Sequence, residues 1–143
     1  MSDSELMQLY SRKILALAAD IPHLGHLDRP SGSGYRRSPQ CGSSVNVDVV
    51  MKDGVIADFA QEVRACALGQ ASAAVLGQSV IGHTRADIAT ARDALVHMLK
   101  EDGTAPAGDF AALEALTPAK EFPNRHASIL LAWDATLAAI DAQ

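Results

Sequence analysis

Cysteine is scarce in this sequence: Cys41 and Cys66 are the two among 143 residues. That number is too small for the disulfide framework of a small secreted protein. A basic excess is also missing, because the formal net charge is −5, whereas nucleic-acid-binding proteins usually carry a positive surplus. No apolar run approaches the roughly 18 residues that a membrane span needs. We therefore expect a cytoplasmic protein that binds neither nucleic acid nor membranes.

The amino terminus lacks the apolar stretch of a secretory signal peptide, because charged residues interrupt it at Asp3, Glu5, Arg12 and Lys13. Aromatic residues are few: six Phe, Tyr and Trp stand against 26 alanines. This composition predicts helices that pack closely through small side chains. At this length one domain, residues 1–143, can bury a hydrophobic core without covalent cross-links.

Alternating polar and apolar residues predict two β-strands, over residues 44–52 and 55–64. Asp53-Gly54 between them is typical of a two-residue hairpin turn, since glycine readily adopts positive φ. A third strand near Tyr35 is expected as well, because an isolated hairpin is only marginally stable. The sequence therefore predicts a small antiparallel sheet.

Helical patterns lie on both sides of these strands. Ser2 and Glu5 have capping-box spacing, and the helix that they begin should end near Asp20. The helices expected after Cys66 are residues 67–79, a helix from Thr84, residues 110–116 and a helix from Pro123. This order predicts an α+β domain, in which one helix precedes a sheet of about three strands and several carboxyl-terminal helices cover it.

Both cysteines lie at junctions between predicted elements. Cys41 precedes the strand at 44–52, and Cys66 lies where the strand at 55–64 gives way to a helix. Backbone N–H groups at a helix start stabilise a thiolate, and nearby Arg64 would add to that effect. Free cysteine is also among the most buried residue types, so ordinary apolar packing is the alternative interpretation.

His126 lies on the apolar stripe of the last predicted helix. A histidine there is more often a hydrogen-bonded core residue than a ligand. If it faces the cysteines, two thiolates and one imidazole make a ligand set suited to zinc or iron. The spacing of these residues is not that of a zinc finger, so their convergence is left open.

The remaining polar motifs give weaker signals. His23 and His26 could bind a metal, but loop histidines at this spacing usually face solvent. The Arg36-Arg37 pair favours a docking or solvated feature over a phosphate site. Neither a Gly-x-Ser-x-Gly nucleophile motif nor a paired-carboxylate motif is present. We therefore expect a protein that is not an enzyme.

A series of short motifs runs along most of the chain. They are Tyr10-Ser11-x-x-Ile14-Leu15, Pro39-x-Cys41-Gly42, Asp53-Gly54-Val55-Ile56, Cys66-Ala67, Gln70-Ala71-Ser72-Ala73, Phe122-Pro123-x-Arg125 and Leu131-Ala132-Trp133. Together they resemble the IscU/SufU family of iron–sulfur cluster scaffold proteins, which includes the NifU amino-terminal domain. The long interval between Cys66 and Phe122 favours the SufU branch over the shorter IscU form.

In that family three cysteines and an aspartate, with a histidine in the IscU branch, gather at one exposed end of the fold. There they hold zinc or a nascent [2Fe–2S] cluster and receive sulfur from a cysteine desulfurase, for delivery to apo iron–sulfur proteins. The resemblance carries Cys41 and Cys66 across directly. It therefore implies a metal- or cluster-binding role for these two residues.

The sequence departs from the family pattern at the other ligand positions. The family aspartate two residues after the first cysteine is Ser43 here. The third cysteine falls on Ser128 in an alignment without a gap. It falls on Ala127 if one residue is inserted so that His126 matches the family histidine. In both alignments the third thiol is missing, and an iron–sulfur cluster usually needs four strong ligands.

Two hypotheses follow from the resemblance and its departures. The first is a divergent scaffold or sulfur acceptor that binds iron, a labile [2Fe–2S] cluster or zinc. Its ligands would be Cys41, Cys66 and His126, with Ser43 and Ser128 as weak positions and Arg64 tuning the thiolates. The alternative is a non-assembling adaptor of the same fold that docks a cysteine desulfurase or an apo-target. A structural zinc domain is a third option.

Overall fold

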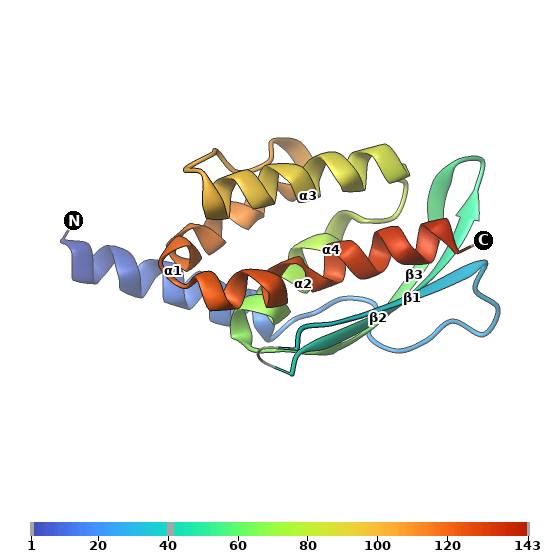
Figure 1. Cartoon of the computed structure of the whole chain (residues 1–143), viewed down its shortest axis with the longest axis horizontal. Coiled ribbons are helices and arrows are strands. Elements are labelled where there is room, and N and C mark those ends of the chain that lie inside the picture. Colours follow the sequence, from blue (N-terminus) through green and yellow to red (C-terminus); the bar gives the residue numbers. More distant parts are fainter. Residues whose placement is uncertain (1, 40–41, 143) are drawn as a thin grey trace.

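The computed structural model describes residues 2–39 and 42–142. Its elements are α1 (Asp3–Ala18), β1 (Gly32–Arg37), β2 (Ser44–Lys52), β3 (Val55–Arg64), α2 (Ala67–Ser79), α3 (Arg85–Lys100), the 3₁₀ helices η1 (Gly108–Glu121) and η2 (Pro123–Arg125), and α4 (His126–Asp141). This order confirms the predicted α+β class, with one leading helix, a small antiparallel sheet and several following helices (Figure 1).

The described strands form one antiparallel sheet in the order β1-β2-β3. Val49 in the central strand pairs with Gly32 of β1 and Phe59 of β3. Asp53 and Gly54 connect β2 to β3 with φ angles of 54° and 80°. Positive φ at both central residues is what a type I′ hairpin turn requires. The predicted turn and the predicted third strand are therefore both confirmed.

Helix α4 packs against one face of the sheet, and α3 lies on the other side of α4 (Figure 1). Glycine in β1 makes this approach possible. A Cβ atom on Gly34 would lie 2.3 Å from the carbonyl oxygen of Ala135 and 2.5 Å from the backbone nitrogen of Ala139. The core valines of β2 are Val45, Val47 and Val49. The atoms of α4 next to Gly34 belong to Ala135, Ala138 and Ala139, so small side chains on the helix also permit this close packing.

A buried hydrogen-bond chain fixes α2 beside α4. Ser72 Oγ in α2 donates to the carbonyl oxygen of Ile129 at 2.7 Å and accepts from Trp133 Nε1 at 3.0 Å. Both Ser72 and Trp133 are completely buried. A buried indole N–H needs an acceptor, so the lone tryptophan ties its position to a serine on the neighbouring helix.

The segment before α4 differs from the sequence prediction. The helix expected over 110–116 is part of the longer 3₁₀ helix η1, which has a kink at Phe110 (φ −104°, ψ 15°) and contains Pro118. Proline has no N–H to donate in an α-helical ladder, which favours this tighter, irregular helix. Pro123 begins the short η2, and the last α-helix starts three residues later, at His126.

His83 links the start of α3 to the start of η1. Its Nδ1 lies 2.9 Å from Asp87 Oδ2, and its Nε2 lies 2.8 Å from Asp109 Oδ2. Partial burial lowers the pKa of His83, but the hydrogen bonds to Asp87 and Asp109 outweigh that effect, so the pKa is raised overall. The protonated imidazole therefore acts as a clamp between two carboxylates.

We expect this clamp to make stability depend on pH. Because the pKa of His83 is higher in the folded than in the unfolded protein, its contribution is complete below the unfolded value of about 6.5. It should be lost as pH rises through the folded value. The free energy of unfolding, measured with urea at a series of pH values, should therefore fall less from acidic to alkaline pH in His83→Gln than in wild type. In Asp109→Asn this reduction should be smaller, and curves parallel to wild type would contradict this account.

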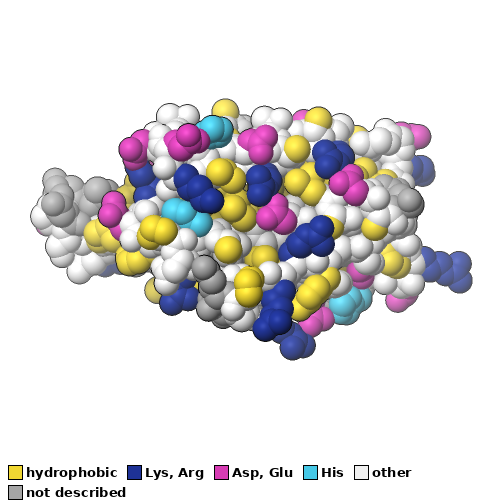
Figure 2. All heavy atoms as spheres, in the orientation of Figure 1, with side chains coloured by type: hydrophobic (Ala, Val, Ile, Leu, Met, Phe, Trp, Pro, Cys, Tyr) yellow, Lys and Arg dark blue, Asp and Glu magenta, His cyan; other side chains and the backbone are white. Residues whose placement is uncertain are grey.

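Charged groups of both signs are scattered over the face of the molecule seen in Figure 2, where basic and acidic side chains are interspersed. Within residues 2–39 and 42–142, no helix is both long and apolar enough to cross a membrane.

Candidate functional site

Cys66 lies at the junction of β3 and α2, as predicted from the sequence. It directly precedes α2 with an extended backbone (φ −67°, ψ 172°), and its side chain does not cap the helix. Gln70 holds the junction: its backbone N–H donates to Cys66 O, and its Nε2 donates to Ala65 O, both at 2.9 Å. Cys66 is partly exposed and carries a free thiol. The residue is therefore partly open to solvent while its backbone is held in place.

Two serine hydroxyls lie next to this thiol. Cys66 Sγ is 3.6 Å from Ser128 Oγ in the first turn of α4, and Ser128 Oγ donates to Ser43 Oγ at 3.0 Å. Both serines are almost completely buried, at 1% and 4% exposure. The structure thus brings Cys66 together with Ser43, at the family's aspartate position, and with Ser128, the third-cysteine position in the alignment without a gap.

The contact of Cys66 with the two serines depends on the backbone of α2 and of the segment that carries Ser43. A Cβ atom on Gly69, near the start of α2, would lie 2.7 Å from Ser128 Oγ, so the glycine lets α4 come close. The segment that carries Ser43 is closed by two backbone hydrogen bonds, from Ser38 N to Ser43 O (2.8 Å) and from Gly42 N to Ser38 O (3.1 Å). Gly42 has a φ of 70°, which glycine tolerates best.

His126 is tied to a different part of the fold. It is buried, with 6% exposure, and its Nε2 lies 2.9 Å from the carbonyl oxygen of Ala119 in η1. A carbonyl can only accept, so Nε2 carries a proton and Nδ1 is the ring nitrogen left for a ligand. Within the described part of the chain, no hydrogen bond joins His126 to Cys66, and Ser128 is the residue of α4 that contacts the thiol.

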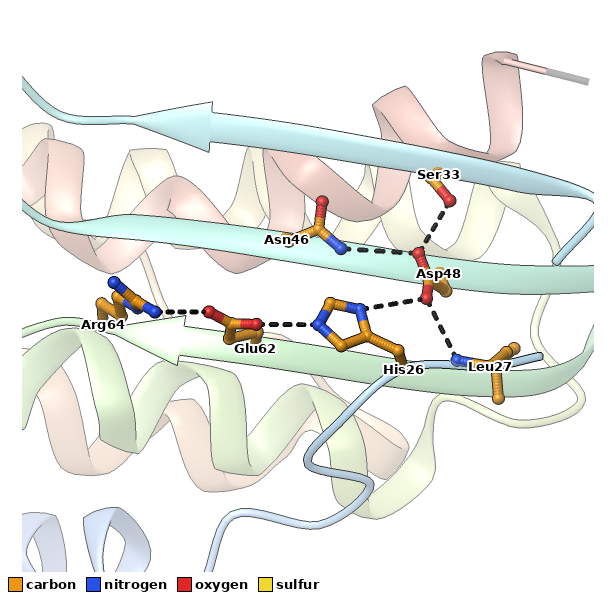
Figure 3. Close-up of polar contacts among 7 residues, drawn as sticks. All are labelled: His26, Leu27, Ser33, Asn46, Asp48, Glu62 and Arg64. Atoms are coloured by element: carbon orange, nitrogen blue, oxygen red, sulfur yellow. Dashed lines mark hydrogen bonds and ion pairs between the residues drawn. The ribbon is translucent and has the colours of Figure 1, made fainter. Parts of the chain in front are cut away.

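Arg64 lies two residues before Cys66, but its guanidinium belongs to a network along the outer face of the sheet (Figure 3). Its side chain is 76% exposed, and Nη2 lies 3.0 Å from Glu62 Oε1. Glu62 Oε2 lies 2.8 Å from His26 Nε2, and His26 Nδ1 lies 3.4 Å from Asp48 Oδ2. The hydrogen bond with Glu62 raises the pKa of His26, and the same bond lowers the pKa of Glu62.

Asp48 is the anchor of this network. Burial raises its pKa, but hydrogen bonds from Ser33 Oγ (2.7 Å), the backbone N–H of Leu27 (3.1 Å) and His26 outweigh burial and lower it overall. His23 pairs with β3 through its backbone carbonyl instead. The two loop histidines therefore hold residues 21–31 against the sheet, and nothing joins them in one site among the described contacts.

Cys41, the other predicted ligand, lies outside the described residues. Within residues 2–39 and 42–142, no group of three or more His, Cys, Asp and Glu side chains could hold a metal ion. The described part of the site therefore offers one thiol and two hydroxyls. A thiolate is a strong ligand for zinc and iron, whereas a neutral hydroxyl is a weak one. The described donors around Cys66 are therefore one strong ligand and two weak ones.

The sequence patterns did not predict two features of this region. The first is the close packing at Gly69, although a glycine inside an alanine-rich helix is a sign of it. The other feature is a pocket where Lys100, from the end of α3, joins Arg36 and Arg37 of β1. The arginine pair is visible in the sequence, but no local pattern connects it to a lysine 63 residues away.

Comparison with known proteins gives consistent matches over nearly the whole chain. The family model of the NifU-like N terminal domain matches residues 9–142. The iron–sulfur cluster assembly scaffold protein IscU of Streptococcus pyogenes serotype M1 is 25% identical over 140 residues, which cover 98% of this chain and 87% of that protein.

Solved structures agree with the sequence relatives. A nitrogen-fixing NifU-like protein (N-terminal) from Brucella abortus is 43% identical, with a TM-score of 0.90 over 95% of this chain and 94% of that one. A candidate iron–sulfur cluster assembly scaffold protein for the SUF system, from Fervidobacterium islandicum AW-1, shares the fold at 20% identity, with a TM-score of 0.82 over 93% and 97%. The chain therefore belongs to the family of the NifU-like N terminal domain.

Proposed function

We propose that this protein is a divergent scaffold that accepts sulfur and iron at Cys66 and Cys41. The observation that supports this proposal is the contact of Cys66 Sγ with Ser128 Oγ and, through it, with Ser43. Ser43 stands at the position of the family aspartate, and Ser128 at that of the third cysteine in the alignment without a gap. The alternative alignment puts that cysteine at Ala127. The contact of Ser128 with Cys66 supports the first alignment.

The first chemical step would be acceptance of sulfur from a cysteine desulfurase. The Cys66 thiolate attacks the outer sulfur of a persulfide on the donor, a new S–S bond forms on Cys66, and the donor cysteine leaves as a thiolate. The partial exposure of Cys66 permits this approach. Ser128 Oγ lies 3.6 Å from the sulfur, and its single hydroxyl hydrogen would have to turn from Ser43 to donate to the anionic sulfur.

Iron or zinc would be held weakly, as cargo. Two thiolates provide the strong bonds, and the hydroxyls of Ser43 and Ser128 are poor substitutes for a carboxylate and a thiolate. His126 would assist only through Nδ1, because Nε2 is engaged with Ala119. Tuning of the thiolates by Arg64 stays a prediction, since its guanidinium pairs with Glu62. We therefore propose a labile [2Fe–2S] cluster or a labile metal ion, to be passed to apo iron–sulfur proteins.

Sulfur transfer tests this function directly. After incubation with a cysteine desulfurase and cysteine, mass spectrometry should find one added sulfur atom on the Cys66 peptide or the Cys41 peptide. Cys66→Ala should abolish the Cys66 adduct and reduce acid-labile sulfide after iron loading by more than half. Ser11→Ala, on exposed α1, is the matched control and should behave as wild type. Absence of persulfide and of cluster on both cysteines would exclude the proposal.

The hydrogen bond between the two serines favours the adaptor alternative as the second candidate. Ser128 donates to Ser43, so the hydroxyl hydrogen of Ser128 has a protein acceptor without a metal. An adaptor would bind a desulfurase or an apo-target through the retained fold alone. Capture of the desulfurase that survives loss of both cysteines, in a protein without metal, would support this role over assembly.

A further inference from the structure

Strand β1 forms one edge of the described sheet, whose order is β1-β2-β3. Backbone groups of successive residues in a strand point alternately to its two sides. Gln61 in β3 bonds through its backbone to the loop before β1, away from β2, so Val47 opposite it turns its own N–H and carbonyl toward Gly34. The backbone groups of Ser33 and Tyr35 therefore point to the open side of β1.

The described contacts agree that this side of β1 is open. Tyr35 is 54% exposed, and its carbonyl oxygen accepts a hydrogen bond from Nη1 of the neighbouring Arg36 at 2.8 Å. Within residues 2–39 and 42–142, no backbone hydrogen bond outside the strand ladders involves Ser33 or Tyr35. An edge of this kind can pair with a further extended chain.

The basic pocket of Arg36, Arg37 and Lys100 lies at the end of the same edge, between β1 and the first half of α4. Lys100 belongs to the end of α3, and the pocket volume is about 410 Å³. The described residues that line it include neither Cys66 nor the two serines beside it, so the pocket is separate from the thiol site. Its apolar lining comes from η2 and α4 and consists of Pro123, Ala127, Leu130 and Leu131.

The positive charge of the basic pocket is available to a ligand. Among the described residues, no ion pair involves Arg36, Arg37 or Lys100, and all three are exposed. Asp134 also lines the pocket, but its carboxylate already accepts from Arg92 Nε at 2.6 Å. Three exposed cations around one hollow attract a negatively charged group.

We infer that β1 docks an extended acidic peptide segment of a partner protein, which adds to the sheet as a further strand and places carboxylates in the basic pocket. The open backbone groups of an edge strand supply affinity for an extended chain, and pockets beside the edge select its side chains. Carboxylates match the guanidinium and ammonium groups, and aliphatic side chains match the apolar lining. This interaction goes beyond the proposed function and requires neither a metal nor a persulfide.

Two other occupants fit the same edge less well. If β1 of a second copy paired with it, Arg36 and Arg37 of both copies would lie on one short ladder, and like charges on facing strands are destabilising. A nucleic acid would match the cations, but it has no peptide groups for the edge and no aliphatic side chains for the apolar lining. An acidic peptide satisfies the cations, the apolar lining and the edge together.

The test uses a fluorescein-labelled peptide of about eight residues, an ordinary strand length, in which glutamate and valine alternate. Fluorescence anisotropy measures its binding to the metal-free protein. We expect saturable binding that is about tenfold weaker in Arg36→Gln/Lys100→Gln, because at least one charge-assisted hydrogen bond is lost. The control Arg12→Gln/Lys52→Gln removes the same charge from exposed positions outside the pocket and should bind as wild type. Circular dichroism should show that both variants keep the fold.

Amide hydrogen exchange tests the added strand separately from the charges. In the free protein the N–H of Tyr35 should exchange faster than that of Gly34, which faces β2. Saturation with the peptide should slow exchange at Tyr35 about tenfold or more and leave Gly34 little changed. A peptide in which glutamine replaces every glutamate should bind about tenfold more weakly.

Several outcomes would overturn the inference. One is the absence of saturable binding, and another is equal affinity in the pocket variant and wild type. Binding without slower exchange at Tyr35 would show attraction by charge alone. Equally tight binding of a single-stranded thymidine oligonucleotide of the same net charge would indicate a nucleic-acid site. A dimer of the free protein that the peptide dissociates would assign the edge to a second copy. Persulfide formation is measured separately, so the failure of this inference would leave the proposed function standing.

Discussion

A Ser128→Cys variant is expected to bind Zn²⁺ about 100-fold more tightly than the native chain. Structural zinc sites with four ligands contribute about 10–16 kcal/mol, or roughly 3 kcal/mol per ligand, and about 1.4 kcal/mol is a tenfold change in affinity. The new thiol would stand where Ser128 Oγ now lies, 3.6 Å from Cys66 Sγ. Competition with a chromophoric chelator measures the dissociation constant, and iron loading should likewise give a longer-lived cluster.

The matched control is Ala127→Cys, which adds a thiol at the position that the alternative alignment favours. Ala127 lines the basic pocket, whereas Ser128 contacts Cys66. Ala127→Cys should therefore leave zinc affinity within a few-fold of wild type. Circular dichroism should confirm that both variants keep the fold. A gain in Ala127→Cys and none in Ser128→Cys would reverse our assignment of the third ligand position.

Gly34→Ala should be the most destabilising single-methyl change in the sheet. The new Cβ would lie 2.3 Å from the carbonyl oxygen of Ala135 and 2.5 Å from the nitrogen of Ala139. These are backbone atoms of α4, so no side chain can turn away to relieve the overlap. Overpacking of a core commonly costs about 1–3 kcal/mol, and we expect the upper end, about 3 kcal/mol or more. Thermal unfolding should show a midpoint lower by roughly 10 °C.

Two further variants show whether the backbone of α4 is the cause. Ala138→Gly in the Gly34→Ala background removes the Ala138 Cβ, 2.8 Å from the new methyl group, but leaves both backbone contacts, so stability should not recover. Tyr35→Ala, at the adjacent position with 54% exposure, should cost less than about 1 kcal/mol. Wild-type stability of Gly34→Ala would mean that α4 does not approach β1 as closely as described.

Local patterns predicted much of the fold because their physical causes are local. The Asp53-Gly54 turn follows from backbone preferences of two residues. The helix expected from Thr84 begins there, and a complete capping box between Thr84 and Asp87 forms its cap. The 3₁₀ form of residues 108–121 was not predicted, because the sequence patterns of α and 3₁₀ helices have similar short-range periodicity. There, tertiary packing around Phe110 and Pro118 selects the tighter form.

The site was only partly predictable. The junction position of Cys66 follows from the change of periodicity around it. The choice between Ser128 and Ala127 as its neighbour does not, because it depends on the rotation of α4 about its own axis. That rotation is set by distant contacts, such as the one between Trp133 and Ser72. The hydrogen bond of His126 to Ala119 could not be predicted either, because it depends on the path that η1 takes through the fold.

The neighbourhood of Cys66 and Ser128 also has an electrostatic consequence. Both α2 and α4 begin there, one directly after Cys66 and the other two residues before Ser128. A helix carries a partial positive charge at its first turn, worth about 0.3–1 kcal/mol to a nearby anion. The two helix dipoles therefore add at one end of a molecule that is acidic overall. A negative charge that develops on the Cys66 sulfur would therefore be stabilised by the first turns of two helices at once.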